Sequence, residues 1–139
     1  MKHLFVYILV FYTCLGNLNS HHPDSAQEAN KPYPTIFISV YEDSYDGYNI
    51  KLHIENFKYS PDKLANSFKE NEGYAIIYIN DIPIGRTYSD WIHVPSRFFN
   101  QELNILKVSI KSLSHQDLIV DYEIISKEII VENYINEIE

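Results

Sequence analysis

Short runs of Ile, Val, Tyr and Phe recur along the chain, separated by clusters of Asp, Asn, Ser, Gly and Pro. The clearest run covers residues 48–57, where the apolar residues Tyr48, Ile50, Leu52 and Ile54 alternate with polar ones. An alternation with a period of two predicts a strand with one face in the core and the other in solvent. No stretch of useful length has the period of an amphipathic helix.

The same pattern predicts strands through most of the chain after residue 34. Residues 73–79 are apolar on both faces, which predicts a central strand, and Ser60-Pro61 predicts one short helical turn over residues 61–68. The other expected strands are residues 35–42, 84–89, 91–94, 103–112, 118–125 and 128–134, with turns at 43–47, 80–83, 113–117 and 126–127. We therefore expect an all-β fold, an immunoglobulin-like or cupredoxin-like antiparallel sandwich of about seven strands.

The first segment has the composition of a signal peptide. Lys2 precedes an apolar run over residues 4–16 that is too short to span a bilayer, and residues 17–20 are polar. We expect residues 1–20 to be a cleaved leader, so that the mature protein is secreted or periplasmic and has no stable membrane span. Cys14, the single cysteine, lies in this leader, so the mature domain is expected to contain no thiolate ligand and no disulfide.

Residues 21–34 contain three prolines and few apolar side chains, which predicts a flexible linker. The β-sandwich domain is then expected over residues 35–139.

The formal net charge of −8 makes nucleic acid and anionic membrane surfaces poor partners, because the protein would repel phosphate groups. The chain also contains no nucleophile elbow, no H-E-x-x-H segment, no phosphate loop and no carboxylate spacing that indicates general acid and base roles. We therefore predict a protein that is not an enzyme and has no catalytic residues.

Four segments resemble a group of small exported bacterial β-sandwich proteins. In that group the pattern E-N-F-x-F-S-P is followed by E-G-H-x-H-x-Y-x-x-G, by R-x-Y-x-x-W-x-H and by a late N-D-H. The corresponding segments here are residues 55–61, 72–78, 86–93 and 113–115, and the resemblance covers about residues 48–120.

The resemblance implies copper binding, because imidazole groups gathered from a strand and two loops suit copper and zinc. His93 and His115 occupy the two later histidine positions, whereas Tyr74 and Ile76 replace the paired histidines. We therefore expect an exported binding domain related to envelope copper-binding proteins, with a degenerate metal site at His93 and His115. Copper is the metal expected there, and a metal ion or an unknown protein is the expected partner.

An alternative function is a protein-interaction module. The strand at residues 128–134 is apolar enough to pair with another chain if it lies at a sheet edge. The aromatic residues Tyr74, Tyr78, Tyr88 and Trp91 either fill the core and the sheet faces or line a sugar or peptide groove. The sequence favours packing for this set and leaves the groove as the alternative.

Overall fold

The computed structural model of the 139-residue chain describes residues 26–62 and 71–133. These residues form eleven strands and one short 3₁₀ helix, η1 (Ser96–Phe98). The strands are β1 (Ala26–Glu28), β2 (Thr35–Glu42), β3 (Tyr48–Glu55), β4 (Lys58–Tyr59), β5 (Glu72–Ile79), β6 (Ile82–Thr87), β7 (Trp91–Val94), β8 (Leu103–Ser112), β9 (Asp117–Val120), β10 (Glu123–Ile124) and β11 (Ser126–Glu132).

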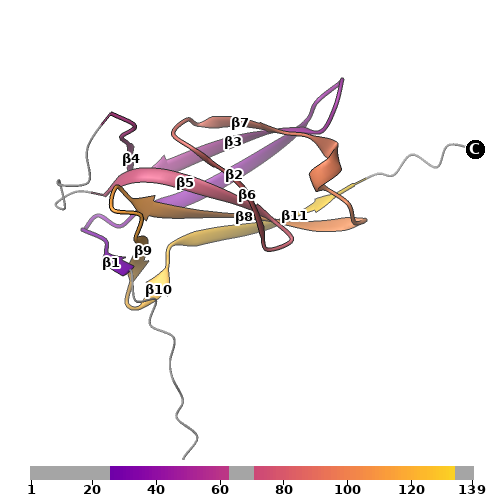
Figure 1. The fold of residues 1–139 in the computed structure, drawn as a ribbon. Coiled ribbons are helices and arrows are strands. Elements are labelled where there is room, and N and C mark those ends of the chain that lie inside the picture. The colour runs from indigo at the N-terminus through magenta and orange to yellow at the C-terminus, as the bar shows by residue number, and fades with distance from the viewer. Residues whose placement is uncertain (1–25, 63–70, 134–139) are drawn as a thin grey trace, which may run out of the picture.

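The strands form two sheets that pack face to face as a sandwich (Figure 1). The smaller sheet has the order β2-β3-β7, with antiparallel pairs on both sides of β3. In the larger sheet β5 and β8 are the central strands; β6 and β4 pair with β5, whereas β11 and β9 pair with β8. Strands β1 and β10 flank β9 and complete eight strands in this sheet.

The core between the sheets is built from alternate positions of the long strands. Ile50 and Leu52 of β3 are fully buried, and the facing sheet contributes Ile77, Val108 and Ile110. Because side chains alternate along a strand, the intervening residues point away from the core on the outer face of each sheet. The side chains that could contact a ligand or partner therefore lie on two outer faces, which are separated by the two sheets and the core between them.

Two hairpins have two-residue turns in which both central residues have positive φ angles. Asn80 (φ 50°) and Asp81 (φ 63°) connect β5 to β6, and Asp121 (φ 50°) and Tyr122 (φ 70°) connect β9 to β10. This conformation matches the right-handed twist of the paired strands, and Asn and Asp tolerate it better than most residues. The tight turns set the register beside each turn, and in the β5–β6 pair the register shifts between Ile77 and Tyr78.

The prediction of an all-β sandwich is confirmed. The expected bounds at 35–42, 91–94 and 103–112 are those of β2, β7 and β8. Eleven strands replace the expected seven or so, because the short strands β1, β4 and β10 carry too few residues for a period to be recognised. The sheets are also not wholly antiparallel, since β1 pairs parallel to β9 and β4 pairs parallel to β5.

Two further details of the prediction are wrong. The expected strand at residues 118–125 is interrupted at Asp121 and Tyr122, where an apolar tyrosine hides a turn from pattern analysis. The expected turn at residues 126–127 is the start of β11, where Ser126 pairs with Ser109 and Lys127 with Val108. Polar residues are found there because β11 pairs with no described strand other than β8, so its other edge has no ladder partner in the described part of the chain.

The prediction of a flexible linker is wrong for its second half. Residues 26–28 form β1, whose register places Ala26 beside Asp117 and Glu28 beside Ile119. Ala29 is buried, and its backbone N–H donates to the carbonyl of Ile119 at 2.9 Å. The sequence pattern missed this contact because the segment gains its order from backbone pairing with a distant strand rather than from apolar side chains.

Two other expectations fall on residues that the structure does not describe. These are the signal peptide at residues 1–20 and, from residue 63 onward, the helical turn at residues 61–68. Across residues 26–62 and 71–133, no helix has the length and apolar character needed to cross a membrane.

Candidate functional site

His93 and His115 lie on opposite sides of the sandwich. His93 is on β7 and is paired with Asn49, on the outer face of the smaller sheet. His115 follows β8 and contacts Tyr74, which is on the outer face of the larger sheet. Stacked sheets are about 10 Å apart, and these side chains point away from each other across that thickness. One metal ion therefore cannot be bound by both imidazoles in this fold.

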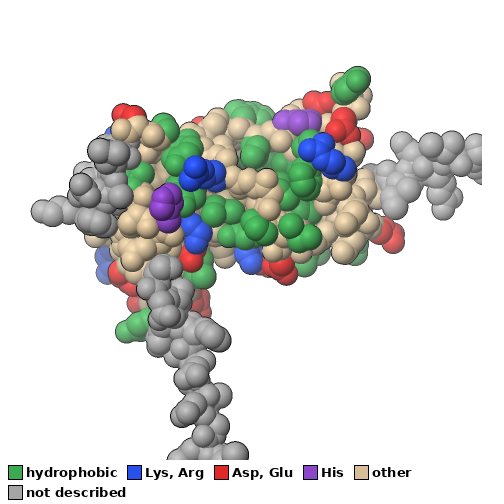
Figure 2. Space-filling model, in the orientation of Figure 1, with side chains coloured by type: hydrophobic (Ala, Val, Ile, Leu, Met, Phe, Trp, Pro, Cys, Tyr) green, Lys and Arg blue, Asp and Glu red, His purple; other side chains and the backbone are tan. Residues whose placement is uncertain are grey.

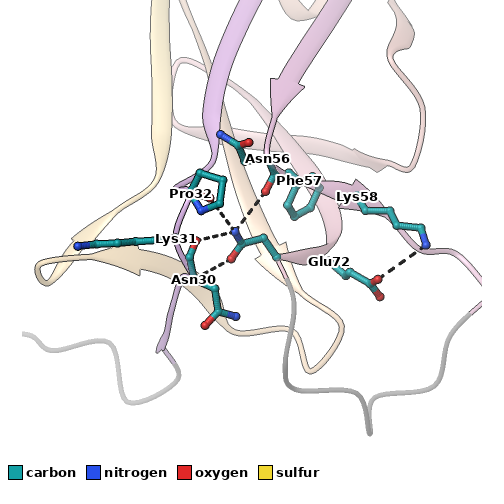
Figure 3. A pocket seen from close by; sticks show the side chains of 8 residues that line it. Asn30, Lys31, Pro32, Asn56, Phe57, Lys58 and Glu72 are labelled. Atoms are coloured by element: carbon teal, nitrogen blue, oxygen red, sulfur yellow. Dashed lines mark hydrogen bonds and ion pairs between the residues drawn. The ribbon is translucent and has the colours of Figure 1, made fainter.

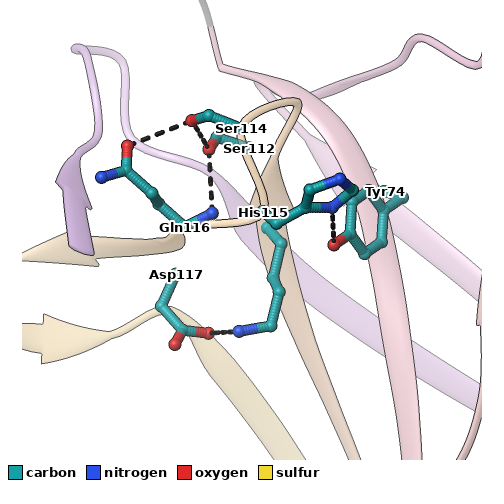
Figure 4. A network of polar contacts seen from close by, with 7 residues as sticks. Tyr74, Ser112, Ser114, His115, Gln116 and Asp117 are labelled. Carbon is teal, nitrogen blue, oxygen red and sulfur yellow. Dashed lines mark hydrogen bonds and ion pairs between the residues drawn. The ribbon is translucent and has the colours of Figure 1, made fainter. Parts of the chain in front are cut away.

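His115 lies in the turn between β8 and β9, where its φ angle is +65° (Figure 4). Its Nδ1 atom lies 2.7 Å from the hydroxyl oxygen of Tyr74 on β5. The turn is also held by Ser112, whose hydroxyl accepts from the backbone N–H of Gln116 at 3.3 Å, and by an ion pair of 2.6 Å between Lys111 and Asp117. These contacts place the imidazole directly over the end of β5.

Tyr74 is 4% exposed although it belongs to an outer face, because neighbouring side chains cover it. Its ring centroid lies 5.6 Å from those of Tyr88 and His115, and the Arg86 guanidinium carbon lies 5.6 Å from the same centroid. Burial raises the pKa of the Tyr74 phenol, against the opposing effect of the Lys111 and Arg86 charges. The phenol therefore acts as a neutral hydrogen-bonding group in a small aromatic and cationic cluster.

Ile76 is two residues further along β5 and therefore on the same outer face as Tyr74. It pairs with Ser109 of β8 and Arg86 of β6. The resembling group has histidines at four positions, which correspond here to Tyr74, Ile76, His93 and His115. Three of these residues lie on the side of the larger sheet, and His93 lies on the outer face of the smaller sheet.

His93 belongs to a polar row at the β2–β3 hairpin end of the smaller sheet. Its Nδ1 atom lies 3.1 Å from Oδ1 of Asn49, and Nδ2 of Asn49 donates to Asp43 at 2.8 Å. The backbone N–H of Tyr45, the Asn49 amide and the N–H of Asp46 lower the pKa of Asp43. Asp43 therefore keeps its negative charge close to His93.

Within the described ranges, no group of three or more His, Cys, Asp and Glu side chains is arranged to hold a metal ion. A tight zinc site needs three or four protein ligands. The neighbour that orients each histidine is a neutral hydrogen-bonding group, Asn49 for His93 and Tyr74 for His115.

The outer face of the smaller sheet presents aromatic side chains to solvent. Tyr41 and Trp91 are each 51% exposed and lie with ring centroids 5.7 Å apart across β3. Phe37 is 49% exposed, and its ring centroid lies 5.9 Å from that of His53. The Nζ atom of Lys51 lies 5.5 Å from the centroid of the Trp91 ring. We call this set of five residues the aromatic face.

The strand register explains this arrangement. Tyr41 pairs with Asn49, and Lys51 pairs with Trp91, so Tyr41 and Trp91 meet diagonally over the central strand. Phe37 and His53 are direct cross-strand partners. Because the sheet has only three strands, these side chains cover much of its width.

A pocket of about 450 Å³ lies where the N-terminal segment meets β4 and β5 (Figure 3). Asn71 lines the pocket and donates from Nδ2 to the carbonyls of Asn30, Pro32 and Asn56 at 2.8, 3.3 and 3.2 Å. Its Oδ1 atom accepts from the N–H of Asn30 at 2.8 Å. The polar groups of this pocket are thus bonded to one another, which makes it a structural junction.

Sequence reasoning placed Trp91 correctly in a strand but favoured packing for it, and it did not single out Tyr41 or Phe37. The signal was present, because in β2 the aromatic residues occupy the positions that alternate with Ile36, Ile38 and Val40. Three aliphatic residues on one face of a strand define the core side, and aromatic residues on the other face are then exposed.

Comparisons with known proteins give no relatives. No protein-family model, no curated protein and no solved structure matches this chain.

Proposed function

We propose that this chain is an exported, non-enzymatic binding domain that recognises a segment of another protein through its aromatic face. The carrying observation is the exposed pair of Tyr41 and Trp91, supported on a sheet whose other side packs against the core. Tyrosine and tryptophan dominate the energetics of protein interfaces, because each offers a large apolar area together with a polar tip.

The geometry favours this surface over the sheet edge that the sequence brought forward. Strand β11 is an edge strand among the described residues, but Lys127, Glu128 and Glu132 are exposed on it. Charged side chains along an edge discourage pairing with another chain. The aromatic face has a different composition, since a single lysine stands among four aromatic or imidazole rings.

The geometry gives less support to a copper-binding function. His93 and His115 face opposite sides, so a metal ion would have to bind at each of them separately, with oxygen ligands or solvent completing the coordination. A double substitution of both histidines would then remove two weak sites rather than one.

The test is selection of random peptides displayed on phage against the immobilised domain. Peptides that bind the aromatic face are expected to change the fluorescence of Trp91, the single tryptophan of the chain. The double variant Tyr41→Ser/Trp91→Ser is expected to weaken their binding by at least about tenfold, because exposed aromatic anchors carry much of an interface's free energy.

A matched control is Ile105→Ser/Ile130→Ser, which removes two exposed apolar side chains from the outer face of the larger sheet. This control should bind the selected peptides as the wild type does. The proposal is refuted if the selected peptides bind the Tyr41→Ser/Trp91→Ser variant with unchanged affinity, or if none of them perturbs Trp91.

A further inference from the structure

We infer that the partner segment is basic, and that it lays arginine or lysine side chains against the β2–β3 hairpin while it covers the aromatic face. This inference rests on the proposed function and adds the chemistry of the partner. Three observations support it: the carboxylates of the hairpin, the cation that the aromatic face already holds, and the net charge of the chain.

The hairpin connecting β2 to β3 carries three acidic residues, Glu42, Asp43 and Asp46. Acidic and histidine side chains, with a Lys or Arg side chain next to them, lie at the end of the molecule where this hairpin projects (Figure 2). The hairpin is continuous with the aromatic face, because Tyr41 immediately precedes Glu42 and the Asp43 carboxylate is bonded to Asn49, the cross-strand partner of Tyr41.

These carboxylates are available to a partner. Among the described residues, the lysine ion pairs are Lys58 with Glu72, Lys107 with Asp81 and Glu128, and Lys111 with Asp117. None of them involves the hairpin. Arg97 follows Ser96, whose hydroxyl donates to Asp46, but its guanidinium lies 4.8 Å from the ring of Phe98. Within the described residues, no lysine or arginine forms an ion pair with the hairpin carboxylates.

The charge of Asp43 is fixed in place. Its carboxylate accepts from the backbone N–H groups of Tyr45 at 2.9 Å and Asp46 at 3.2 Å, in addition to Asn49. These bonds orient the carboxylate within the turn. The turn also packs closely against β7, since a Cβ atom at Gly47 (φ +71°) would lie 2.2 Å from the carbonyl oxygen of Val94. A preorganised carboxylate loses little entropy when it binds a cation.

The aromatic face has the chemistry to hold cations. Lys51 already places its ammonium 5.5 Å from the Trp91 ring centroid, which is a cation–π contact within the molecule. Tyr45 at the hairpin tip is 97% exposed and offers a further ring beside the carboxylates. An arginine satisfies both features, since its planar guanidinium stacks on aromatic rings and donates to carboxylates in a bidentate fashion.

The formal net charge of −8 acts at longer range. A field of this sign attracts a basic segment and repels an acidic one, which raises the association rate at low ionic strength. Exposed charges that are separated by more than about 10 Å are screened at 0.1 M salt. The effect of the hairpin carboxylates on binding should therefore be distinguishable from that of the whole surface. The two effects differ in which carboxylates contribute and in how strongly salt weakens them.

The test uses three synthetic peptides of equal length in which serine alternates with arginine, glutamine or glutamate. Binding to the full domain is measured by Trp91 fluorescence and by anisotropy of labelled peptide. We expect the arginine peptide to bind at least about tenfold more tightly than the glutamine peptide, and the glutamate peptide not to bind. We expect Glu42→Gln/Asp46→Asn to weaken the binding of the arginine peptide several-fold, which is the effect expected from the loss of two partly exposed ion pairs.

Glu123→Gln/Glu128→Gln is the matched control, since it removes two exposed carboxylates distant from the hairpin. The inference is overturned if this control weakens the arginine peptide as much as the hairpin variant does, or if the arginine and glutamine peptides bind equally. If the arginine and glutamine peptides bind equally and neither binds Tyr41→Ser/Trp91→Ser, the proposed function is retained and only the basic partner is rejected. Selected peptides that all leave Trp91 unperturbed reject both.

Discussion

The hydroxyl of Tyr74 lies 2.7 Å from Nδ1 of His115. In the pattern that implies copper binding, Tyr74 occupies the position of the first paired histidine on the strand, and His115 occupies the position of the last histidine. The position where the resembling group has a histidine is therefore close to His115. Tyr74 supplies a hydroxyl in place of an imidazole, so the contact is a hydrogen bond within the protein.

Replacing Tyr74 by phenylalanine removes this hydrogen bond and leaves the ring contacts in place. We expect a loss of about 1 kcal/mol in the free energy of unfolding, which is the net value of one typical hydrogen bond. Urea titration followed by circular dichroism measures the change. Tyr88→Phe is the matched control, because Tyr88 contributes its ring to the same cluster. An unchanged free energy of unfolding in Tyr74→Phe would show that water stabilises the hydroxyl in the unfolded chain as well as His115 does in the folded one.

The positions of the two histidines predict additive behaviour toward copper. Sites on opposite faces with no shared ligand are independent, so the losses in copper uptake for His93→Ala and His115→Ala should add in the double variant. Calorimetric titration of the three variants with copper measures this. If each single variant alone lost as much copper uptake as the double variant, a shared ion would be required, and the arrangement of the two faces described above would then be wrong.

Tyr59 predicts a fall of stability at alkaline pH. Burial, and secondarily the charge of Asp90, raise the pKa of its phenol to about 12, against about 10 in an unfolded chain. The folded protein therefore holds this proton to higher pH, and the stability it contributes decreases as the pH rises from about 10 through 12. Tyr59→Phe should lose this part of the pH dependence.

The hydroxyl of Tyr59 is also buried and has no hydrogen-bond partner among the described residues. Tyr59→Phe is therefore expected to raise the stability at neutral pH by about 1 kcal/mol, because it removes the desolvation cost of the hydroxyl. Urea unfolding at pH 8 and near pH 11 tests both effects, with Tyr45→Phe at the exposed hairpin tip as control. A stability that decreases equally in wild type and Tyr59→Phe between these pH values would contradict the assignment.

Asn104 is fully buried and joins two loops at one end of the sandwich. Its Oδ1 atom accepts from Asn80 at 2.9 Å and from the N–H of Gln101 at 3.2 Å, and its Nδ2 donates to the carbonyl of Gln101 at 2.7 Å. Asn104→Leu leaves these partners unsatisfied and should cost about 2–3 kcal/mol of stability. Thermal unfolding is the measurement, and a loss below about 0.5 kcal/mol, the size of an ordinary surface substitution, would exclude a structural role for the network.

Gly73 is the second residue of the central strand β5 and lies at a place where no side chain fits. Its φ angle is +157°, and a Cβ atom would lie 1.8 Å from the carbonyl oxygen of Lys111 on β8. Gly73→Ala should therefore separate β5 from β8 locally and cost about 3 kcal/mol or more. Gly85→Ala is the control, because nothing lies within 4 Å of a Cβ atom there. Equal stability of the two variants would contradict this packing.

The sequence pattern predicted the sandwich because its long strands carry their own signal. In β2 and β3 the alternation of apolar and polar residues alone separates the core side from the outer side. Strands such as β1 and β4 depend on pairing with distant segments, and residues 26–28 contain no alternation that a local pattern could use. Their existence follows from tertiary contacts only.

The histidines show the same limit. Spacing along the chain placed His93 and His115 near strand ends correctly, but it could not say that the chain crosses from one sheet to the other between β6 and β7. This crossing brings Tyr88 to the Tyr74 cluster and carries His93 to the opposite outer face. Two residues that fit one motif are separated because the motif spans a change of sheet.

The parallel pairing of β1 with β9 has a consequence for the order in which this chain folds. Ala26 lies beside Asp117, so the first described strand cannot pair until a segment near the end of the domain is available. Contacts between such distant residues close large loops and form slowly. If the chain is exported, as proposed above, and emerges with its N-terminus first, residues 26–28 remain unpaired until β9 is released. The domain could then complete its larger sheet only after nearly the whole chain has crossed.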